Sequence, residues 1–291
     1  MVKRKLKALN IVDYLIVAYF CVLVTITLVP IMNILSLSVS DNTTALHNMG
    51  MLFPKWGHIE PDAYFAVLKS KAIYTSFLMS ILITATATFF HIATTVCAGF
   101  SLSKKKLPGR NILLLFIVFT MLFNGGLIPN YLAIKDYQMD NTFWVMVIPG
   151  AVSGYSIVLM KNYIGQLPAS MIEAAEIDGA NPFYVLWRII IPLSVPIIAT
   201  LSLFCAVGKW NDWTTAYFYI DEARWLWPFQ NVLQTVVVEM DTSEMQGIDL
   251  SNLGEAFKNA LIVISILPVV VIYLCTQKYL IKGLFIGSVK E

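Results

Sequence analysis

Few side chains in this sequence could take part in bond-making chemistry. The 291 residues include 18 Asp and Glu, 20 Lys and Arg and 3 His, and these do not form the spacings that catalysis uses. The metalloprotease pattern H-E-x-x-H, the nucleophile elbow G-x-S-x-G and the phosphate-binding pattern G-x-x-x-x-G-K-[ST] are all absent. Ser101 and Lys104 fit S-x-x-K, which we ascribe to chance on a basic loop. We therefore predict a chain that is not an enzyme and binds no ATP itself.

The cysteines do not form a metal site by their spacing. Cys21, Cys97, Cys205 and Cys275 each lie in an apolar stretch, and no two of them form a C-x-x-C pair. We interpret them as small core residues, because free cysteine behaves as a small hydrophobic side chain. The sequence predicts neither a metal centre nor a disulfide framework.

A short segment after residue 168 carries the clearest local signals. Ser170 and Glu173 have the spacing of a capping box, which predicts a helix that starts at Ser170. Ala174 and Ala175 favour this helix and leave it a thin face that another backbone can approach. Gly179 stands where the helix should stop, because glycine adopts left-handed backbone angles without a steric cost.

A second helix is expected directly after this stop. Asn181 followed by Pro182 is typical of a helix start, and the helix should run through Trp187 toward Pro192. The segment is then a helix, a glycine turn and a helix on the inner membrane surface. These local signals also fit an amphipathic hairpin at the membrane interface in which the acidic residue and the glycine only shape the helix ends.

Polar and aromatic side chains in apolar stretches are candidates for a substrate pathway, because polar groups are costly in lipid. Asn124 stands beside two glycines that should break or loosen its helix. Trp210, Asn211 and Trp213 follow a later apolar stretch. Belt aromatics at the membrane interface and helix-capping asparagines are the competing interpretation. His91, in the middle of another apolar stretch, is expected to be buried and hydrogen-bonded.

The composition places all of these residues in a membrane protein. Hydrophobic residues make up 58% of the chain and charged residues 13%, with a mean hydropathy of +0.72, whereas charged residues reach about 25% in soluble domains. The net charge of +2 is too balanced to suggest nucleic acid as a partner. A spanning helix needs about 20 apolar residues. Six ranges meet this requirement: 11–37, 74–100, 111–134, 142–163, 189–209 and 259–280.

The distribution of lysine and arginine predicts the orientation, since these residues favour the cytoplasmic side. Basic residues precede the first range, fill the connection 104–110, flank 164–188 and follow the last range. Both termini and the 164–188 loop are therefore expected in the cytoplasm.

The segment around Glu173-Ala174-Ala175 resembles the EAA loop of ABC importer permeases. That motif is E-A-A, three residues, G, nine residues and I-x-L-P, and here Gly179 and 189-Ile-Ile-Ile-Pro-192 follow at the same spacing. Ile191 replaces the usual leucine, which is the one departure. Asp178-Gly179-Ala180 also matches a common D-G-A extension of the motif.

Three further segments resemble the carbohydrate-uptake class of these permeases, the group of the maltose permease. Residues 123–129, FNGGLIP, and the tail 279–290 resemble its polysaccharide and oligosaccharide branch, of which an alginate-type importer is one member. Trp210-Asn211-Asp212-Trp213 resembles a W-N element of the class. The resemblance implies an all-α membrane protein with the type I ABC importer permease fold: one permease domain over 1–291, with six transmembrane helices and a cytoplasmic coupling helix.

The resemblance also implies a complex in a bacterial cytoplasmic, or inner, membrane. Its other members are a second homologous permease, two ATPase subunits that bind ATP and Mg, and an external or periplasmic sugar-binding protein that delivers an oligosaccharide. Asn124, Trp210, Asn211 and Trp213 are the tentative pathway residues. The residues implied in coupling to the ATPase are Glu173, Ala174, Ala175, Asp178, Gly179, Ala180 and Pro192, and a C-terminal tail with Lys282, Gly283 and Gly287 is implied to reach the ATPase.

Other classes of membrane protein remain open on the residues alone. A self-sufficient secondary transporter would use His91, Lys209 or Asp212 for ion coupling, although no inverted repeat is evident. A scaffold or receptor would bind a soluble partner through the inner loop. A peptide or amino-acid importer is the nearest alternative within the ABC permeases.

Overall fold

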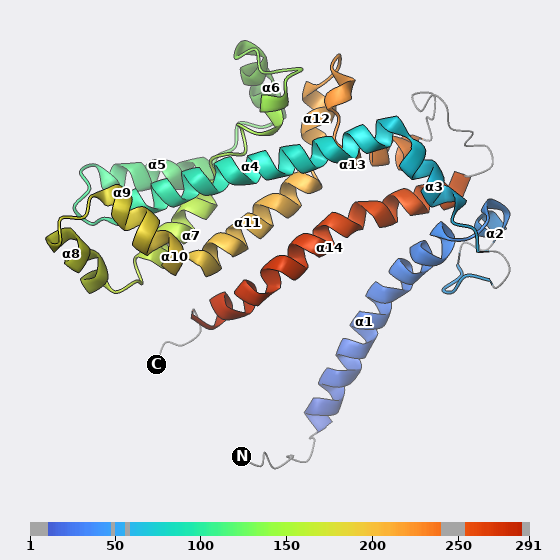
Figure 1. The fold of residues 1–291 in the computed structure, drawn as a ribbon, viewed down its shortest axis with the longest axis horizontal. Helices are drawn as coiled ribbons and strands as arrows, with labels where there is room; N and C mark the ends of the chain where they lie inside the picture. Colours follow the sequence, from blue (N-terminus) through green and yellow to red (C-terminus); the bar gives the residue numbers. More distant parts are fainter. Residues whose placement is uncertain (1–10, 48–49, 56–58, 240–253, 287–291) are drawn as a thin grey trace. The chain divides into compact units, whose positions relative to one another are not determined.

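The computed structural model describes residues 11–47, 50–55, 59–239 and 254–286. Within these residues the regular structure is helical, apart from one antiparallel bridge between Ser40 and Ile59. The chain divides into two compact units, Met1–Lys71 with Asp241–Ile264, and Ala72–Met240 with Ser265–Glu291. Figure 1 labels the helices of both units.

The first unit is dominated by one long apolar helix, α1. Its large hydrophobic side chains are exposed around the whole helix, and no polar face interrupts them, which is typical of a helix that lipid surrounds. After α1, Ser38 Oγ and Tyr64 Oη lie 2.8 Å apart and join the helix end to α3. The helices of this unit are α1 (Ile11–Ser38), α2 (Asn42–His47), α3 (Asp62–Lys69) and the first part of α14 (Gly254–Ile286).

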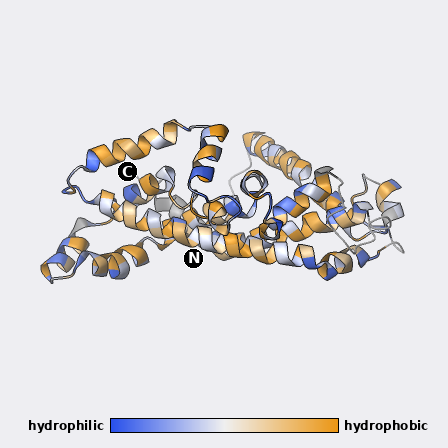
Figure 2. Cartoon of the chain, turned by 90° about the horizontal axis from the view of Figure 1, so that it is seen from above, coloured by the Kyte–Doolittle hydropathy of each residue, from blue (hydrophilic) through white to orange (hydrophobic). Residues whose placement is uncertain are grey.

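The second unit contains the remaining helices, several of them short. Figure 2 shows that apolar residues dominate the long helices of the chain. Helices of this unit before residue 165 are α4 (Lys71–Ser103), α5 (Arg110–Leu122), α6 (Leu127–Asp136), η1 (Phe143–Met146) and α7 (Gly154–Ile164). Those after it are α8 (Ala169–Ile177), α9 (Pro182–Val185), η2 (Leu186–Ile190), α10 (Ile191–Leu193), α11 (Val195–Trp210), α12 (Thr214–Tyr219), η3 (Arg224–Leu226), α13 (Phe229–Gln234), η4 (Thr235–Glu239) and the rest of α14.

Three helices of the described residues are long and apolar enough to cross a membrane, namely α1, α4 and α14. They cover the predicted ranges 11–37, 74–100 and 259–280. Two bent helix pairs raise the number to five if each pair forms one span, namely α5 with α6, and the run from α9 to α10 with α11. Each pair departs from the straight helix expected from the apolar pattern.

The expected helix over 111–134 is broken at Asn124–Gly126, where α5 and α6 diverge by 117°. Gly126 has φ 86° and ψ 179°, a conformation that is essentially restricted to glycine. Asn124 Oδ1 accepts a hydrogen bond of 2.9 Å from the Gly126 amide, so the side chain holds the break. The glycines were expected to loosen this helix, and the break confirms that effect.

The prediction of a continuous helix over 142–163 is wrong. The chain forms a short 3-10 helix, η1, and then a turn, and α7 begins only at Gly154. Pro149 and Gly150 lie in the turn, where proline offers no amide hydrogen and glycine disfavours helix. Ser153 restarts the helix, because its side chain accepts a hydrogen bond of 3.4 Å from the Ser156 amide.

The range 189–209 also departs from one straight helix. The chain turns by 79° between Leu193 and Val195. Ser194 at the bend donates its amide hydrogen to the carbonyls of Ile190 and Ile191. Pro196 lies in the first turn of α11, where proline fits because amides there need no helical partner.

Two clusters of buried side chains hold the second unit together. The first, which we call the inner cluster, joins α4, α7, η2 and α11 through the buried residues Val96, Phe100, Met160, Ile164, Val185, Leu186, Ile190 and Leu201. The second joins α4, η1 and α12 through Ile83, Val145, Met146, Ala216, Ile220 and Leu226. The inner cluster matters for the site, because the α8–α9 segment packs on it.

Candidate coupling surface and polar hollow

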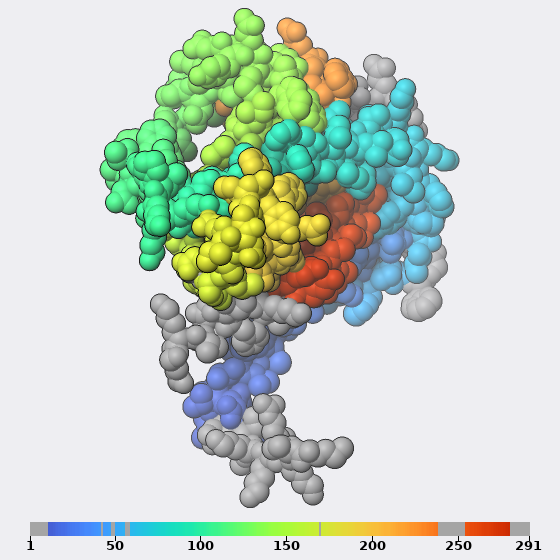
Figure 3. All heavy atoms as spheres, turned by 60° about the vertical axis from the view of Figure 1, so that its left-hand side comes forward, coloured from blue at the N-terminus to red at the C-terminus, as the bar shows by residue number. Residues whose placement is uncertain are grey.

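The segment from α8 to α9 forms a helix, a turn and a second helix at the surface of its unit. Figure 3 shows it in yellow at the front of this face. α8 begins at Ala169, directly after Pro168, whose side chain makes no capping hydrogen bond. The predicted start at Ser170 with a capping box is therefore wrong. Pro168 has φ −58° and ψ 119°, an extended conformation that proline adopts readily and that brings the chain into the helix.

One face of α8 attaches the helix to the protein. Ile172 and Ala175, together with Ala180 beyond the turn, pack against the inner cluster. Glu173 and Ala174 lie on the exposed part of α8. The E-A-A residues are thus divided, with the second alanine inside and the other two residues free to contact a partner.

The turn after α8 has a defined hydrogen-bond pattern. Gly179 has φ 80°, the left-handed conformation predicted for the helix stop. Its amide donates to the Glu176 carbonyl at 3.1 Å, and the Ala180 amide donates to the Ala175 carbonyl at 2.9 Å. This pair of bonds is a Schellman motif, which satisfies two carbonyls at the helix end. The direction of the chain beyond α8 is therefore determined by backbone geometry.

The second helix starts and continues as the sequence predicts, with one added feature. Asn181 Oδ1 accepts a hydrogen bond of 2.8 Å from the Tyr184 amide, and Pro182 is the first helical residue. The helix then widens into a π-helical turn, in which the Ile191 amide donates to the Leu186 carbonyl. Pro192 explains the wider turn, because its ring would collide with the carbonyl four residues earlier in a regular α-helix.

Large apolar side chains are exposed on this segment. Ile177 is 86% exposed, Phe183 72% and Trp187 66%. Exposed apolar groups of this size beside polar residues mark an interaction surface. We call these three residues, with Glu173 and Ala174, the coupling surface.

An ion pair connects α8 to the loop between α4 and α5. Lys104 Nζ lies 3.5 Å from Glu176 Oε1, and the same ammonium lies 4.9 Å from the centre of the Phe100 ring. Arg110 Nε donates a hydrogen bond of 2.8 Å to the Leu102 carbonyl and closes the loop between α4 and α5. Lys104 thus ties α8 to this loop, while Arg110 shapes the loop itself.

Three of the predicted pathway residues have structural partners. Trp210 is 1% exposed, its indole nitrogen donates to the Ser265 carbonyl at 2.9 Å, and its ring meets Phe77 edge to face. The Trp213 carbonyl accepts a hydrogen bond of 2.9 Å from Asn231 Nδ2. Asn124 holds the α5–α6 break described above. The side chains of Trp210 and Asn124 therefore have structural roles, whereas the bond at Trp213 involves only its backbone.

Asn211 is the most accessible of the predicted pathway residues at the end of α11. It is exposed, its Nδ2 donates to the Val207 carbonyl at 3.0 Å, and its Oδ1 accepts from Gln230 Nε2 at 3.4 Å. The backbone of α14 continues through Lys282 and Gly283. Gly287 lies outside the described residues.

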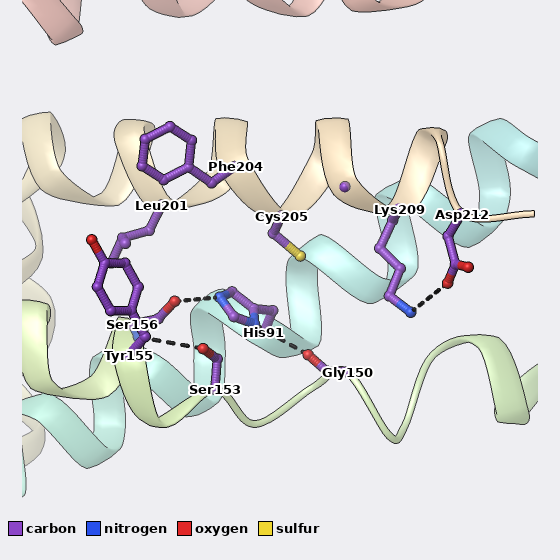
Figure 4. Close-up of a pocket in the computed structure, with 11 residues that line it drawn as sticks. His91, Gly150, Ser153, Tyr155, Ser156, Leu201, Phe204, Cys205, Lys209 and Asp212 are labelled. Atoms are coloured by element: carbon purple, nitrogen blue, oxygen red, sulfur yellow. Dashed lines mark hydrogen bonds and ion pairs between the residues drawn. The ribbon is translucent and has the colours of Figure 1, made fainter. Parts of the chain in front are cut away.

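A hollow of about 540 Å³ lies beside α11, between α4 and the start of α7. Figure 4 shows Tyr155 and Phe204 toward one end, Lys209 and Asp212 at the other, and His91 between them. The remaining lining residues are Gly150, Ser153, Ser156, Leu201, Cys205 and Gly208. The volume is within the range of 300–1,000 Å³ that is typical of small-molecule sites.

His91 is held in place as a part of the wall. Its Nε2 lies 3.0 Å from Ser156 Oγ and its Nδ1 lies 3.2 Å from the Gly150 carbonyl oxygen. The side chain is buried. Both ring nitrogens therefore have protein partners, as expected from the sequence.

The charged end of the hollow is an ion pair. Lys209 Nζ donates to the Met146 carbonyl at 2.8 Å and lies 3.6 Å from Asp212 Oδ2. Asp212 also accepts hydrogen bonds from Thr214 and Thr215, including one of 2.6 Å from Thr215 Oγ1. Burial alone raises the pKa of Asp212, but the Thr215 and Thr214 bonds and the charge of Lys209 together bring this pKa below its ordinary value.

Comparison with known proteins places the chain in a family. Residues 63–286 match the family model described as "Binding-protein-dependent transport system inner membrane component". The chain belongs to this family. The permease is 37% identical to Protein LplC of Bacillus subtilis over 268 residues, which are 91% of this chain and 90% of the relative.

Two further relatives have informative names. The polygalacturonan/rhamnogalacturonan transport system permease protein YtcP of Bacillus subtilis is 33% identical over 285 residues, 96% of this chain and 98% of the relative. A crystal structure of a bacterial ABC transporter involved in the import of the acidic polysaccharide alginate contains a similar chain. It has a TM-score of 0.85 and 32% identity, and the match covers 94% of this permease and 99% of that chain. The all-α ABC importer permease fold expected from the sequence is confirmed.

The structure brings the predicted coupling residues together, but it does not bring the predicted pathway residues to the hollow. The E-A-A residues, the glycine stop and Pro192 form one surface segment. The predicted pathway residues do not line the hollow, whereas Tyr155, Phe204 and Gly208 line it and were not singled out from the sequence. The sequence spacing could have indicated these residues. Leu201, Phe204 and Gly208 recur every three or four residues on one side of α11, and Asp212 follows at the same spacing just beyond the helix.

Proposed function

We propose that this permease forms half of the translocation pathway of an ATP-driven importer for oligosaccharides or polysaccharides. The family description supports the dependence on a binding protein. The relatives whose names mention polygalacturonan, rhamnogalacturonan and alginate support a glycan as the substrate, and acidic glycans are the first class to test. In this proposal both termini and the loop 164–188 are cytoplasmic.

The permease works with four other chains in this proposal. These are a second, homologous permease that completes the pathway, two ATPase subunits that bind and hydrolyse ATP with Mg, and an external sugar-binding protein. The permease itself supplies no ATP site, in agreement with the absence of a phosphate-binding pattern from its sequence.

The observation that carries the coupling role is the exposed coupling surface on a rigidly oriented hairpin. Ile177, Phe183 and Trp187 are apolar and exposed, while the Schellman motif at Gly179 and the packing of Ile172 hold the hairpin to the inner cluster. A partner that closes on this surface moves the hairpin as a unit. Closure of the two ATPase subunits would thereby move the membrane helices from one arrangement to another, through hinge and shear motions.

Purification of the tagged permease from its own membrane tests the proposal first. Mass spectrometry of the co-purifying chains should find an ATPase and a second permease. The isolated complex, reconstituted in liposomes with the binding protein, should import labelled oligogalacturonide or oligoalginate only when ATP is inside. Import that continues without any ATPase chain would instead support a secondary transporter.

A further inference from the structure

The hollow beside α11 holds one ion pair and several further polar groups, although most of its exposed lining is apolar. Lys209, Asp212 and Ser153 line it together with His91, at the side of a helix whose other residues are mostly apolar. Charged side chains in or beside membrane-spanning helices are placed toward water-filled space or toward protein, because exposure to hydrocarbon is costly. The open side of the hollow therefore faces an aqueous path or another protein surface.

We propose that this hollow is a charge-neutral contact site for a sugar ring, which recognises ring faces and hydroxyl groups and does not select for carboxylates. The inference rests on the proposed function and adds to it the kind of contact that the substrate makes. It assigns the site to Tyr155, Phe204, Gly208, Lys209 and Asp212.

The aromatic end suits the apolar face of a sugar ring. Phe204 on α11 is 58% exposed and Tyr155 on α7 is 56% exposed, and Figure 4 shows both beside the hollow. Sugar rings present C–H groups on one face, and rigid aromatic side chains provide large contact area with little loss of side-chain entropy. Tyr155 adds a hydroxyl group that can donate and accept hydrogen bonds.

The polar end suits hydroxyl groups better than carboxylates. Lys209 and Asp212 neutralise each other at 3.6 Å, so this end of the hollow carries no net charge. Of three N–H groups on the ammonium, one is used by the Met146 carbonyl and one is directed to Asp212. A sugar hydroxyl can accept from the remaining N–H group, whereas the Asp212 oxygens already accept from Thr214, Thr215 and Lys209. A carboxylate would gain from Lys209 but be repelled by Asp212.

Gly208 allows the site to be filled without disturbing the fold. It lines the hollow, it is a helical residue of α11, and a Cβ added to it meets nothing within 4 Å. Gly208→Leu therefore places a large side chain in open space, and the change also favours helix. Gly208→Ala is the matched control, because it makes the same backbone change and leaves the space open.

Ligand-detected NMR of the purified complex without its binding protein tests the site directly. The probes are oligogalacturonide, oligoalginate and the carboxyl-reduced form of each. Wild-type complex should saturate ring protons of the acidic and the reduced forms to within twofold, Gly208→Ala should match wild type, and Gly208→Leu should lose at least fivefold of the signal. Equal signals from Gly208→Leu and wild type, or at least a tenfold preference for the acidic form, would overturn the inference.

A double-mutant cycle of Lys209 and Asp212 tests separately whether the site is charge-neutral. Lys209→Gln leaves Asp212 unpaired and should weaken binding of the acidic probe at least threefold more than that of the reduced probe. Asp212→Asn leaves Lys209 unpaired and should reverse that preference, while the single amide oxygen of asparagine can keep one of the two bonds from Thr215. The double variant should again treat both probes alike. A cycle in which the single variants show no probe preference would contradict the neutral site.

Import assays separate this inference from the proposed function. Wild-type complex that imports no probe in liposomes would refute both. Import by wild type and equally by Gly208→Leu would refute the contact site alone. Co-purification of the second permease with Gly208→Leu at the wild-type ratio is expected, and its loss would show that the hollow is occupied by the partner permease and is no sugar site.

Discussion

Lys104 and Glu176 form an ion pair of 3.5 Å between the α4–α5 loop and α8. Both side chains are partly exposed, so the pair contributes little to stability, about 0–1 kcal/mol as is usual for surface pairs. Its position is more informative than its strength. It joins α8 to the C-terminal end of α4, and α4 carries His91 in the wall of the hollow.

Reversal of either charge in this pair should weaken coupling. We expect Lys104→Glu or Glu176→Lys to lower ATP-dependent import about two- to fivefold, because like charges then push α8 away from the loop. The double reversal, Lys104→Glu with Glu176→Lys, should restore most of the import. Import by the liposome assay and the amount of permease in the membrane are the measurements. A double variant no better than the singles would show that the pair has no role in coupling.

Replacement of Gly179 should uncouple transport. The left-handed conformation costs a residue with a Cβ about 1–2 kcal/mol, while no neighbouring atom blocks the space, so the protein should still fold. Gly179→Asp should abolish most import, since it adds this strain and a charge to the coupling surface. Gly179→Asn should retain more import, because asparagine tolerates the left-handed conformation. Normal uptake by Gly179→Asp would refute the coupling role of the segment.

Trp210→Phe distinguishes a structural residue from a pathway residue. Phenylalanine keeps the edge contact with Phe77 but cannot donate to the Ser265 carbonyl, which should lower the free energy of unfolding by about 1–2 kcal/mol. The apparent KM for the glycan should stay at the wild-type value. Thermal unfolding in detergent and uptake kinetics are the measurements. A raised KM with unchanged thermal stability would instead show that Trp210 contacts the substrate in the pathway.

Gly99→Ala should loosen the packing of α4 on α7. A Cβ at Gly99 would lie 2.7 Å from Met160 Cγ and 3.2 Å from the Lys161 backbone nitrogen. Overpacking of this kind costs about 1–3 kcal/mol, which exceeds the gain in helix propensity of up to about 1 kcal/mol. The melting temperature should fall, and adding Met160→Ala should recover part of the loss only if the clash is its cause.

Truncation after Gly283 tests the implied role of the C-terminal tail. The removed residues include Gly287. We expect the truncated permease to assemble but to release the ATPase from its control by the binding protein, which would appear as at least a twofold rise in basal ATP hydrolysis. Full-length permease in the same membrane preparation is the control. Unchanged control of ATP hydrolysis by the binding protein would show that the tail does not act on the ATPase.

Local rules predicted the coupling segment well. The glycine stop at Gly179 and the Asn181 cap depend on backbone conformations that few residues adopt, so short sequence patterns report them. The start of α8 was misplaced by one residue, because Pro168 satisfies the entry geometry without a side-chain cap. The exposure of Ile177 and Phe183 could not be predicted, since it depends on which face packs on the inner cluster.

Apolar composition predicted where helices lie but not their breaks or their contacts. The ranges 142–163 and 189–209 are apolar throughout, and their turns come from Pro149-Gly150 and from Ser194 at positions that hydropathy ignores. Trp210 was a pathway candidate as an aromatic residue near an interface, but its partner Ser265 is 55 residues away. The hollow consists of residues from three distant segments, which a linear reading does not bring together.

The π-helical turn at Leu186–Ile190 has a consequence for the spacing of the chain. Each residue of a helix rotates the following ones by about 100°, and this turn holds one residue more than a regular α-helical turn would. The wide turn therefore absorbs the extra residue locally, because five residues in it rotate the chain about as far as four residues of a regular α-helix. Loss of a single residue there would leave Phe183 on nearly the same side of the helix axis relative to the residues that follow, so this turn is the place where the segment can adjust its length without reorienting the coupling surface.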